Sequence, residues 1–277
     1  MTAQRTILIT GATDGLGRRT AEKLASPDVL LLVHGRNPTR GRAVVEAIEA
    51  ASGSATFYEA DFASLDAVRQ MAEAIATAHP HLDVLINNAG IGDAQRRLSK
   101  DGHELHFAVN YLAPFLLTEI LRPCLGRKRP SRVINVASAS QNPIDFGDVM
   151  LKHGYDGYRA YGQSKLANIM HSFDLAQDLH GSNVTSASLH PGTYMDTNMV
   201  RAAGVRPVTS VDVGAEAVLA LVNNPSDAIS GRYFDGKREV RANAQAYNVE
   251  ARQKLRQLSM ELTELSSTVE AVQRALF

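Results

Sequence analysis

Short apolar runs alternate along the chain with longer segments in which apolar residues recur every three or four positions. The short runs are rich in leucine and β-branched residues, and several are apolar almost throughout, as expected of strands covered on both faces. Seven segments have this character: Thr6–Thr10, Val29–His34, Ala55–Ala60, Val84–Asn87, Arg132–Ala137, Val184–Leu189 and Gly231–Phe234. The pattern predicts a buried parallel sheet.

The segments between these runs have helical periodicity. Six helices are predicted: Gly15–Ala25, Thr39–Ala51, Leu65–Ala78, Gly102–Leu121, Tyr158–Leu179 and Val211–Val222. Ser64 is placed to cap the third helix, because a serine oxygen can accept from the free amides of a first turn. Alternating strands and helices favour an α/β fold with a doubly wound, mostly parallel, seven-stranded Rossmann-like sheet and helices on both faces.

No internal repeat, low-complexity tract or long linker divides the 277 residues, so residues 1–277 are predicted to form one domain. After Phe234 the pattern changes, and residues 238–277 are polar and helix-prone. Apolar positions recur there at Leu255, Leu258, Met260, Leu262 and Leu265. This C-terminal helical extension could cover the substrate cleft, form a subunit interface or pack on the domain surface.

Charge and cysteine content narrow the partners and the compartment. The 29 lysines and arginines balance 29 acidic residues, so no positive excess favours nucleic acid or an anionic membrane as the main partner. No apolar run reaches the ~20 residues of a membrane span, and Ile7–Ile9 is too short for a signal-peptide core. Cys124 is the single cysteine and is expected to be a packed thiol in a reducing compartment. We therefore expect a cytoplasmic protein.

A glycine-rich turn, Thr10-Gly-Ala-Thr-Asp-Gly-Leu-Gly17, joins the first predicted strand to the first helix. Glycine permits positive φ there and lets backbone amides approach a pyrophosphate, whose charge the helix N-terminus favours. The spacing is Gly-x-x-x-Gly-x-Gly, so the turn alone is a modest signal for a dinucleotide. The strand before it and the helix after it strengthen that signal.

The second predicted strand ends in His34-Gly-Arg36. An acidic side chain here would accept hydrogen bonds from an adenosine ribose, whereas a basic one favours a 2′-phosphate. Arg36, followed by Arg40 and Arg42, therefore predicts NADP rather than NAD. The alternative is that Arg36 is an ordinary surface arginine and either cofactor binds.

Two further strand ends contribute to the predicted cofactor site. Asn87-Asn-Ala-Gly90 ends the fourth strand, and its small residues let a ligand lie over the sheet edge. Asp61, after the third strand, could receive the adenine amino group, cap the next helix, or do both.

A Tyr-x-x-x-Lys spacing occurs twice, at Tyr161-Gly-Gln-Ser-Lys165 and at Tyr233-Phe-Asp-Gly-Lys237. Residues four apart share one face only in a helix. The second copy begins on a predicted strand and runs through an Asp-Gly turn signal, so its side chains should diverge. We therefore assign proton transfer to Tyr161 and none to Tyr233.

A free phenol titrates near 10, and an adjacent ammonium with a cationic nicotinamide would stabilise its phenolate. We therefore expect the pKa of Tyr161 to fall towards the working pH. Ser138, at the end of the fifth strand, could hold the substrate oxygen near Tyr161, with Ser140 as the local competitor. Asn110, on the preceding predicted helix, could hold a water in a relay to Lys165.

Taken together, these motifs resemble those of the short-chain dehydrogenase/reductases over nearly the whole chain, and most closely the retinol dehydrogenase-like branch. The resemblance rests on Thr10–Gly17, Asn87–Gly90, Val109-Asn-Tyr-Leu-Ala-Pro-Phe-Leu-Leu-Thr118, Ser138, Ala160–Asn168 and Ser188-Leu-His-Pro-Gly192, which occur in the family's order. It implies catalytic roles for Asn110, Ser138, Tyr161 and Lys165, with Tyr161 as general acid/base. The implied cofactor-binding residues are Gly11, Thr13, Asp14, Gly15, Leu16, Gly17, Arg36, Asp61, Phe62, Asn88, Ala89, Gly90, Tyr161, Lys165, Pro191, Gly192 and Thr193.

Three departures from that branch bear on these assignments. Asp14 stands in the glycine turn where a neutral or basic residue is frequent, which weakens the preference for NADP. Ala137 replaces the first of two common serines, although the second is present. The segment Gly192–Thr197 is one residue longer than the usual pattern, so either Thr193 or Thr197 could face the cofactor.

The sequence thus predicts a metal-free NADP-dependent oxidoreductase acting on a carbonyl or alcohol. Two alternatives remain open: a reductase of a carbon–carbon double bond, and a catalytically silent NADP-binding regulatory or scaffold protein. His103-Glu-Leu-His106 lacks the four-residue spacing of a zinc protease motif, so we interpret it as a solvated helix face.

The substrate and the oligomeric state are less constrained. Phe146, Met150, Tyr155, Met195 and Met199 suggest an apolar substrate cleft, but they could equally anchor their loops. By resemblance, the apolar faces of residues 110–121 and 166–179 form a two-fold interface of a homodimer or homotetramer. Burial of the same faces within the monomer is the alternative.

Overall fold

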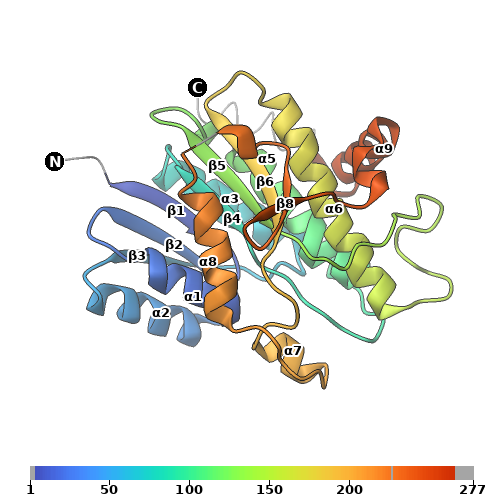
Figure 1. Cartoon of the computed structure of the whole chain (residues 1–277), viewed down its shortest axis with the longest axis horizontal. Helices are drawn as coiled ribbons and strands as arrows, with labels where there is room; N and C mark the ends of the chain where they lie inside the picture. The colour runs from blue at the N-terminus through green and yellow to red at the C-terminus, as the bar shows by residue number, and fades with distance from the viewer. Residues whose placement is uncertain (1–3, 226, 266–277) are drawn as a thin grey trace.

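One eight-stranded sheet forms the centre of the computed structural model, which describes residues 4–225 and 227–265 (Figure 1). The strand order is β3-β2-β1-β4-β5-β6-β7-β8, and every neighbouring pair is parallel except β7 and β8. The strands are β1 Arg5–Ile9, β2 Val29–Gly35, β3 Ser54–Glu59, β4 Val84–Asn87, β5 Ser131–Val136, β6 Val184–His190, β7 Tyr233–Asp235 and β8 Arg238–Val240.

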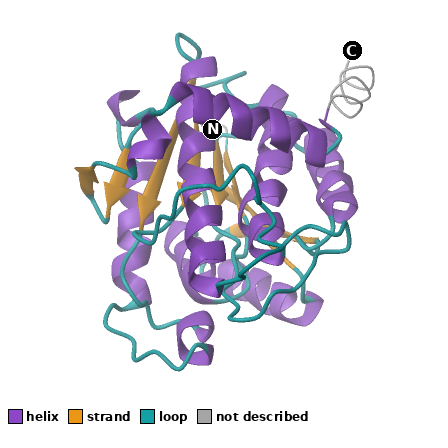
Figure 2. Ribbon diagram, turned by 90° about the vertical axis from the view of Figure 1, so that its right-hand side faces the viewer, coloured by secondary structure: helices purple, strands orange, loops and turns teal. Residues whose placement is uncertain are grey.

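Helices cover both faces of the sheet, as the view in Figure 2 shows. The α-helices are α1 Gly15–Leu24, α2 Pro38–Ala50, α3 Leu65–Ala78, α4 Leu105–Phe107, α5 Ala113–Leu121, α6 Gly157–Asp178, α7 Asn198–Ala202, α8 Val211–Val222 and α9 Val249–Leu262. Shorter elements are the π-helix η1 Ala108–Leu112 and the 3-10 helices η2 Arg122–Cys124, η3 Asp227–Ile229 and η4 Ala244–Tyr247.

Two apolar clusters hold these layers together. One lies between the sheet and α3, α5 and α6, and the other between the sheet and α1, α2 and α8. Strands β4 and β6 are buried along their whole length, which explains why their residues are apolar or small except for the last one of each strand, Asn87 and His190. Cys124 belongs to the first cluster and burial raises the pKa of its thiol, which confirms the packed thiol.

The predicted α/β class, parallel sheet and two-sided helical cover are confirmed, and the structure adds one strand. β8 pairs antiparallel with β7 across a turn in which Gly236 has φ +59°. Its three residues, Arg238, Glu239 and Val240, fall in the segment for which the sequence predicts a C-terminal helical extension. Helix in that extension begins only at η4, and residues 266–277 lie outside the described part of the chain.

The predicted helix over residues 102–121 is interrupted by the π-helix η1. Pro114 has no amide hydrogen, so it cannot donate to the Asn110 carbonyl as a regular α-helix would require. The Asn168 side chain donates to that carbonyl instead, at 2.7 Å. A wider turn at Asn110 therefore follows from a proline four residues later, together with an amide from α6.

Helix α9 packs on the side of α6 that faces away from the sheet (Figure 1). The Ser259 and Tyr111 hydroxyls are 2.6 Å apart, and Arg252 donates to Asp174 at 2.6 Å. The sequence leaves two interpretations of the apolar faces of residues 110–121 and 166–179, a subunit interface or burial within the monomer. These contacts favour burial within the monomer for part of those faces. In the described residues, no helix is long and apolar enough to cross a membrane.

Candidate active site

The order of the sheet reverses between β1 and β4, which is where doubly wound sheets bind ligands. β1 pairs with β2 on one side and with β4 on the other. The connections that leave the carboxyl ends of β1 and β4 are therefore the glycine turn and the Asn88–Gly90 segment. The structure brings these two predicted elements into direct contact.

Three glycines allow the close packing of the turn after β1. Gly11 and Gly15 have φ +63° and +50°, in the left-handed region that favours glycine. A Cβ atom at Gly17 would lie 2.3 Å from the Gly11 carbonyl oxygen and 2.4 Å from Asn88 Nδ2. Asp14 caps α1 by accepting from the Gly15 amide at 2.8 Å. The N-terminus of α1 is thus held at this edge of the sheet.

Thr10 joins the glycine turn to the end of β4. Its Oγ1 accepts from the amides of Asn88 and Ala89 at 2.9 and 3.0 Å. In return, Asn88 Nδ2 donates to the Thr10 carbonyl at 2.8 Å. Hydrogen bonds therefore join two segments about 78 residues apart in the chain, at the edge of the sheet where the cofactor site is predicted.

His34 supports the glycine turn and is not among the site residues predicted from the sequence. Its Nδ1 accepts from the Gly11 amide at 3.2 Å, and its Nε2 donates to the Ala60 carbonyl at 3.1 Å. Its ring stacks on Phe62 at 4.2 Å, so the Phe62 side chain is a packing partner beneath the turn. Burial lowers the pKa of His34 to about 4, which keeps the ring neutral at physiological pH. A histidine inside an otherwise apolar strand was the available signal.

The end of β2 presents the predicted phosphate-reading arginine. Thr13 lies over Gly35, where a Cβ atom would be only 2.4 Å from Thr13 Cγ2. Arg36 follows in an exposed position. Arg40 forms an ion pair with Asp14 at 3.5 Å, so the unusual acid of the glycine turn faces the second arginine of this group.

Ser64 and Asp61 have different roles after β3: Ser64 caps α3, and Asp61 stabilises the turn before it. Ser64 caps α3 by accepting from the Ala67 amide at 3.4 Å, as predicted. Asp61 Oδ1 accepts from the Ala63 amide at 3.0 Å and closes the turn before that helix.

Tyr161 and Lys165 lie on the first turns of α6. Asp156 caps this helix by accepting from the Arg159 amide at 2.9 Å, and the residues that follow continue it without a break. Lys165 Nζ is 5.6 Å from the centre of the Tyr161 ring and donates to the Val136 carbonyl at 3.0 Å. Burial lowers the pKa of Lys165 to about 8.

Ser138, rather than Ser140, reaches Tyr161. The Ser138 side chain lies close enough to the phenol to lower its pKa, whereas Ser140 is exposed and donates its own amide to Ser138 Oγ at 3.1 Å. Burial raises the pKa of Tyr161, and the Ser138 side chain opposes that rise. The lower pKa that we expect beside an ammonium and a cationic nicotinamide concerns the cofactor complex and stays a prediction.

Asn110 is fully buried in η1 and binds the loop after β4. Its Oδ1 accepts from the Ile91 amide at 2.8 Å, and its Nδ2 donates to the Ile91 carbonyl at 3.1 Å. A Cβ atom at Gly90 would lie 3.3 Å from Asn110 Oδ1 and 3.2 Å from Lys165 Nζ. Both predicted relay residues therefore face the same side of Gly90.

The segment after β6 closes over the glycine turn. Thr193 Oγ1 hydrogen-bonds His190 Nε2 at 3.0 Å, whereas Thr197 caps α7 and lies beside Gly15. Asn198 Nδ2 also donates to Asp14 at 2.6 Å. Of the two threonines weighed for the cofactor, Thr197 is thus the one in contact with the glycine turn.

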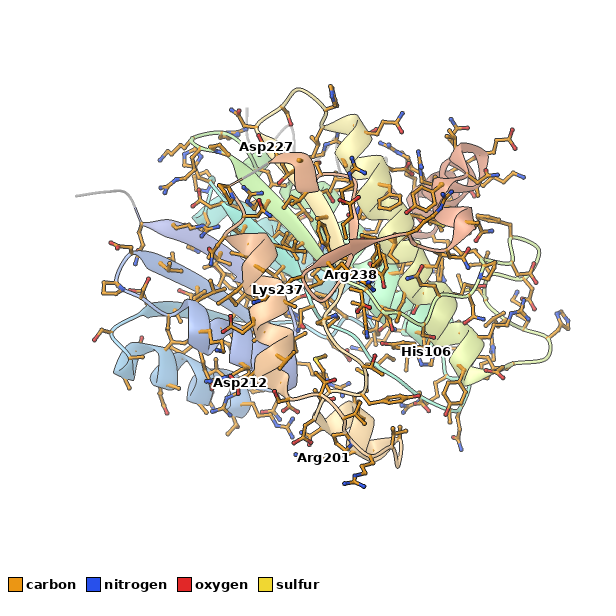
Figure 3. All side chains as sticks on the ribbon, in the orientation of Figure 1. His106, Arg201, Asp212, Asp227, Lys237 and Arg238 are labelled. Atoms are coloured by element: carbon orange, nitrogen blue, oxygen red, sulfur yellow. The ribbon has the colours of Figure 1, made fainter. Side chains whose placement is uncertain are left out.

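The interpretation of His103–His106 as a solvated helix face is wrong for His106, which is fully buried. His106 Nδ1 donates to the buried Glu104 carboxylate at 3.0 Å, and its Nε2 accepts from the Asp93 amide at 2.9 Å. The ring stands edge-on to Tyr161 at 6.2 Å, near the N-terminal end of α6 (Figure 3). The Tyr155 hydroxyl donates to the same carboxylate at 3.1 Å. The Glu104–His106 pair therefore contacts both Tyr155, on the predicted substrate loop, and the ring of Tyr161.

Comparison with known proteins identifies the family. A sequence model described as short chain dehydrogenase matches residues 5–206. The chain belongs to the short-chain dehydrogenases. It is therefore an NAD(P)-dependent oxidoreductase, and neither a double-bond reductase nor a silent binding protein is favoured.

Similarity to curated retinol dehydrogenases supports the retinol dehydrogenase-like branch. Human retinol dehydrogenase 14 is 35% identical over 267 residues, which cover 85% of this chain and 79% of that protein. Mouse polyprenol dehydrogenase is 40% identical over 210 residues, covering 72% of this chain and 62% of that protein.

A solved structure supports the arrangement of the dehydrogenase fold. A short chain dehydrogenase from Burkholderia cenocepacia J2315, in complex with NADP, aligns with a TM-score of 0.69 and 27% identity. The alignment covers 84% of this chain and 95% of that one.

Proposed function

We propose that this short-chain dehydrogenase interconverts a carbonyl and an alcohol with NADP(H), with Tyr161 as the proton donor in reduction. One observation carries the proposal: the Ser138 side chain lies beside the Tyr161 phenol and lowers its pKa, while Lys165 Nζ lies 5.6 Å from the centre of the Tyr161 ring. A carbonyl oxygen between Ser138 and Tyr161 would receive one hydrogen bond from each. Dipoles placed where charge develops are an effective way to lower such a barrier.

The residues at the carboxyl ends of β1 and β4 fit a dinucleotide. The amides at the start of α1 favour a pyrophosphate, and Gly15 keeps that side of the turn free of a Cβ atom. Gly90 leaves room above Lys165, whose ammonium would hold the nicotinamide ribose. When bound, the nicotinamide supplies or accepts the hydride.

Tyr161 carries the proton in this scheme. Its buried phenol has a raised pKa, so it is protonated at neutral pH and can donate to the carbonyl oxygen as the alcohol forms. Lys165 then stabilises the phenolate that remains, and a water held beside Asn110 and Lys165 would return the proton. In oxidation the same groups act in the opposite order.

NADP is proposed over NAD because of the residues at the end of β2. Arg36 is exposed there and no acidic side chain takes the place of a ribose acceptor. A guanidinium binds a phosphate through charge-assisted hydrogen bonds, which suits a 2′-phosphate. The Burkholderia relative's complex with NADP is consistent with this choice.

We propose a long apolar alcohol or aldehyde of isoprenoid type as the substrate. Retinol and polyprenol, the substrates named for two relatives, are apolar isoprenoid alcohols. Tyr194 and Met199, on the segment that follows β6, are 52% and 37% exposed and offer apolar contact area. Phe146 and Met195 are further candidates for that lining.

Titration of the purified protein with NADPH and NADH, followed by retinal and a panel of shorter aldehydes and ketones, tests the proposal. We expect tighter binding of NADPH and oxidation of the bound cofactor by retinal. Cofactor binding without reduction of any aldehyde or ketone on the panel would favour double-bond reduction or a catalytically silent role. Failure to bind either cofactor would contradict the proposal. The cytoplasmic location and the homo-oligomer stay predictions, which fractionation and light scattering can check.

A further inference from the structure

The second Tyr-x-x-x-Lys copy places a buried phenol behind the catalytic serine. Tyr233 begins β7, is 3% exposed, and donates from its hydroxyl to the Ser138 carbonyl at 2.9 Å. Lys237 is exposed and lies in the turn between β7 and β8 (Figure 3), whereas Tyr233 is buried, so the two side chains diverge as predicted. The phenol thus lacks the ammonium of its own motif, and its partner is the main chain of Ser138.

A second donor reaches the same carbonyl. Gln141 Nε2 donates to the Ser138 oxygen at 3.0 Å. Gln141 Oε1 in turn accepts from the Asn243 amide at 2.7 Å, so the segment that leads to α9 holds this glutamine. A carbonyl oxygen has two acceptor sites, and here both have a side-chain donor.

Ser138 needs such support because the sheet no longer holds it. The Ala137 amide donates to the Leu189 carbonyl at 2.8 Å, the last of these bonds along β5. The chain then leaves the sheet, and rotation of the next peptide would swing the Ser138 hydroxyl away from Tyr161. Displacements of this size matter, because about 1 Å of misplacement can cost about 100-fold in rate.

We propose that Tyr233 and Gln141 are positioning residues that fix the Ser138 peptide so that its hydroxyl stays aimed at Tyr161. The inference rests on the proposed catalytic role of Ser138. It gives Tyr233 a function through its hydrogen bond alone, without proton transfer to substrate or cofactor. It also makes the C-terminal segment around Asn243 a support of the active site, through Gln141.

Tyr233→Phe removes one hydrogen bond and keeps the ring, so it tests the proposal directly. We expect kcat with NADPH and a carbonyl to fall roughly five- to tenfold, consistent with a net bond of about 1 kcal/mol, with an unchanged Kd for NADPH. Tyr111→Phe is the matched control, because that buried hydroxyl bonds Ser259 on α9. It should leave kcat unchanged.

A double-mutant cycle separates positioning from general destabilisation. If Tyr233 acts through Ser138, then Tyr233→Phe should have no further effect on kcat in a Ser138→Ala background. An equal fall in both backgrounds, or wild-type kcat in Tyr233→Phe, would overturn the proposal. Gln141→Met removes the other donor and serves the same test if Tyr233→Phe does not fold.

Amide hydrogen exchange gives a readout that needs no turnover. The Ser140 amide donates to Ser138 Oγ, so its exchange should accelerate in Tyr233→Phe if the serine loses its fixed position. Unchanged exchange would contradict the positioning role of Tyr233, whichever reaction the enzyme catalyses. If exchange accelerates while Ser138→Ala keeps full activity, Tyr233 does position the Ser138 peptide, and the proposed catalytic role of Ser138 is wrong.

Discussion

Gly90 and Lys165 approach each other so closely that a single methyl group on Gly90 would lie 3.2 Å from the lysine Nζ. This contact is tighter than ordinary van der Waals distance, and the same methyl group would lie 3.3 Å from Asn110 Oδ1. The absence of a side chain at Gly90 therefore leaves room for Lys165, which we place at the nicotinamide ribose, and for Asn110, which we place in the proton relay.

Gly90→Ala should disturb Lys165 without unfolding the protein. Nζ must move by a few tenths of an ångström, so we expect kcat to fall roughly tenfold with little change in Tm. Gly92→Ala is the control, because a Cβ atom there would meet Met199 at an ordinary 3.5 Å. Equal kcat values for the two variants would show that the space beside Lys165 is not needed.

Arg36→Asp should change the choice of cofactor. Loss of a charge-assisted bond to the 2′-phosphate should weaken NADPH binding about 10- to 100-fold, whereas NADH binding should change little. Fluorescence titration measures both constants, with Lys254→Asp on the exposed side of α9 as the control. Equal losses for both cofactors would mean that Arg36 does not read the phosphate.

The glycine turn and the Tyr161–Lys165 pair could be predicted because each depends on local spacing. Gly11, Gly15 and Gly17 follow a strand that its apolar run makes plain, and four-residue spacing defines a helical face. The supports of these groups could not be predicted in the same way. Tyr233 lies 95 positions from Ser138, so their contact depends on strand order and register.

His106 shows a different limit of the sequence. A regular helix was predicted over residues 102–121, and on that assumption His103 and His106 share a face that water could cover. The observed helix starts only at Leu105, and the π-helix that follows turns later residues to new directions. The polar pair Glu104 and His106 could be buried because each satisfies the other, which composition alone does not reveal.

The Glu104 carboxylate should make stability sensitive to acid. Burial alone would raise its pKa, but hydrogen bonds from His106 and from the Phe107 and His106 amides outweigh burial and hold the pKa below its ordinary value. Because the folded protein then holds the proton less tightly than the unfolded chain does, this stabilisation is present above pH about 4.5 and lost as the pH falls through the lower folded value.

Glu104→Gln should therefore destabilise the protein by about 2 kcal/mol at pH 7, because one acceptor becomes a donor facing the Phe107 amide. The difference from wild type should shrink as the pH falls below about 4. Chemical denaturation across this range measures it, with Glu46→Gln on the exposed side of α2 as the control. A difference that is independent of pH would contradict the account of Glu104.

Lys165 should act on stability at the other end of the pH scale. Burial lowers its folded pKa to about 8 from an ordinary value of 10.5, so between these values the unfolded chain binds more protons. Stability of the cofactor-free protein should then rise with pH across this window, by up to about 1.4 kcal/mol per unit. Lys165→Met should remove this rise, and an unchanged slope in the variant would contradict the assignment.

The most direct test of the central claim is the comparison of Tyr161→Phe with wild type, with NADPH binding and single-turnover carbonyl reduction measured on the same preparations. The variant keeps the ring that lies edge-on to His106 and loses only the hydroxyl that Ser138 contacts. We predict nearly normal NADPH binding and a loss of about 10²- to 10⁴-fold in the reduction rate. Retention of the wild-type rate would contradict the role of Tyr161 as proton donor.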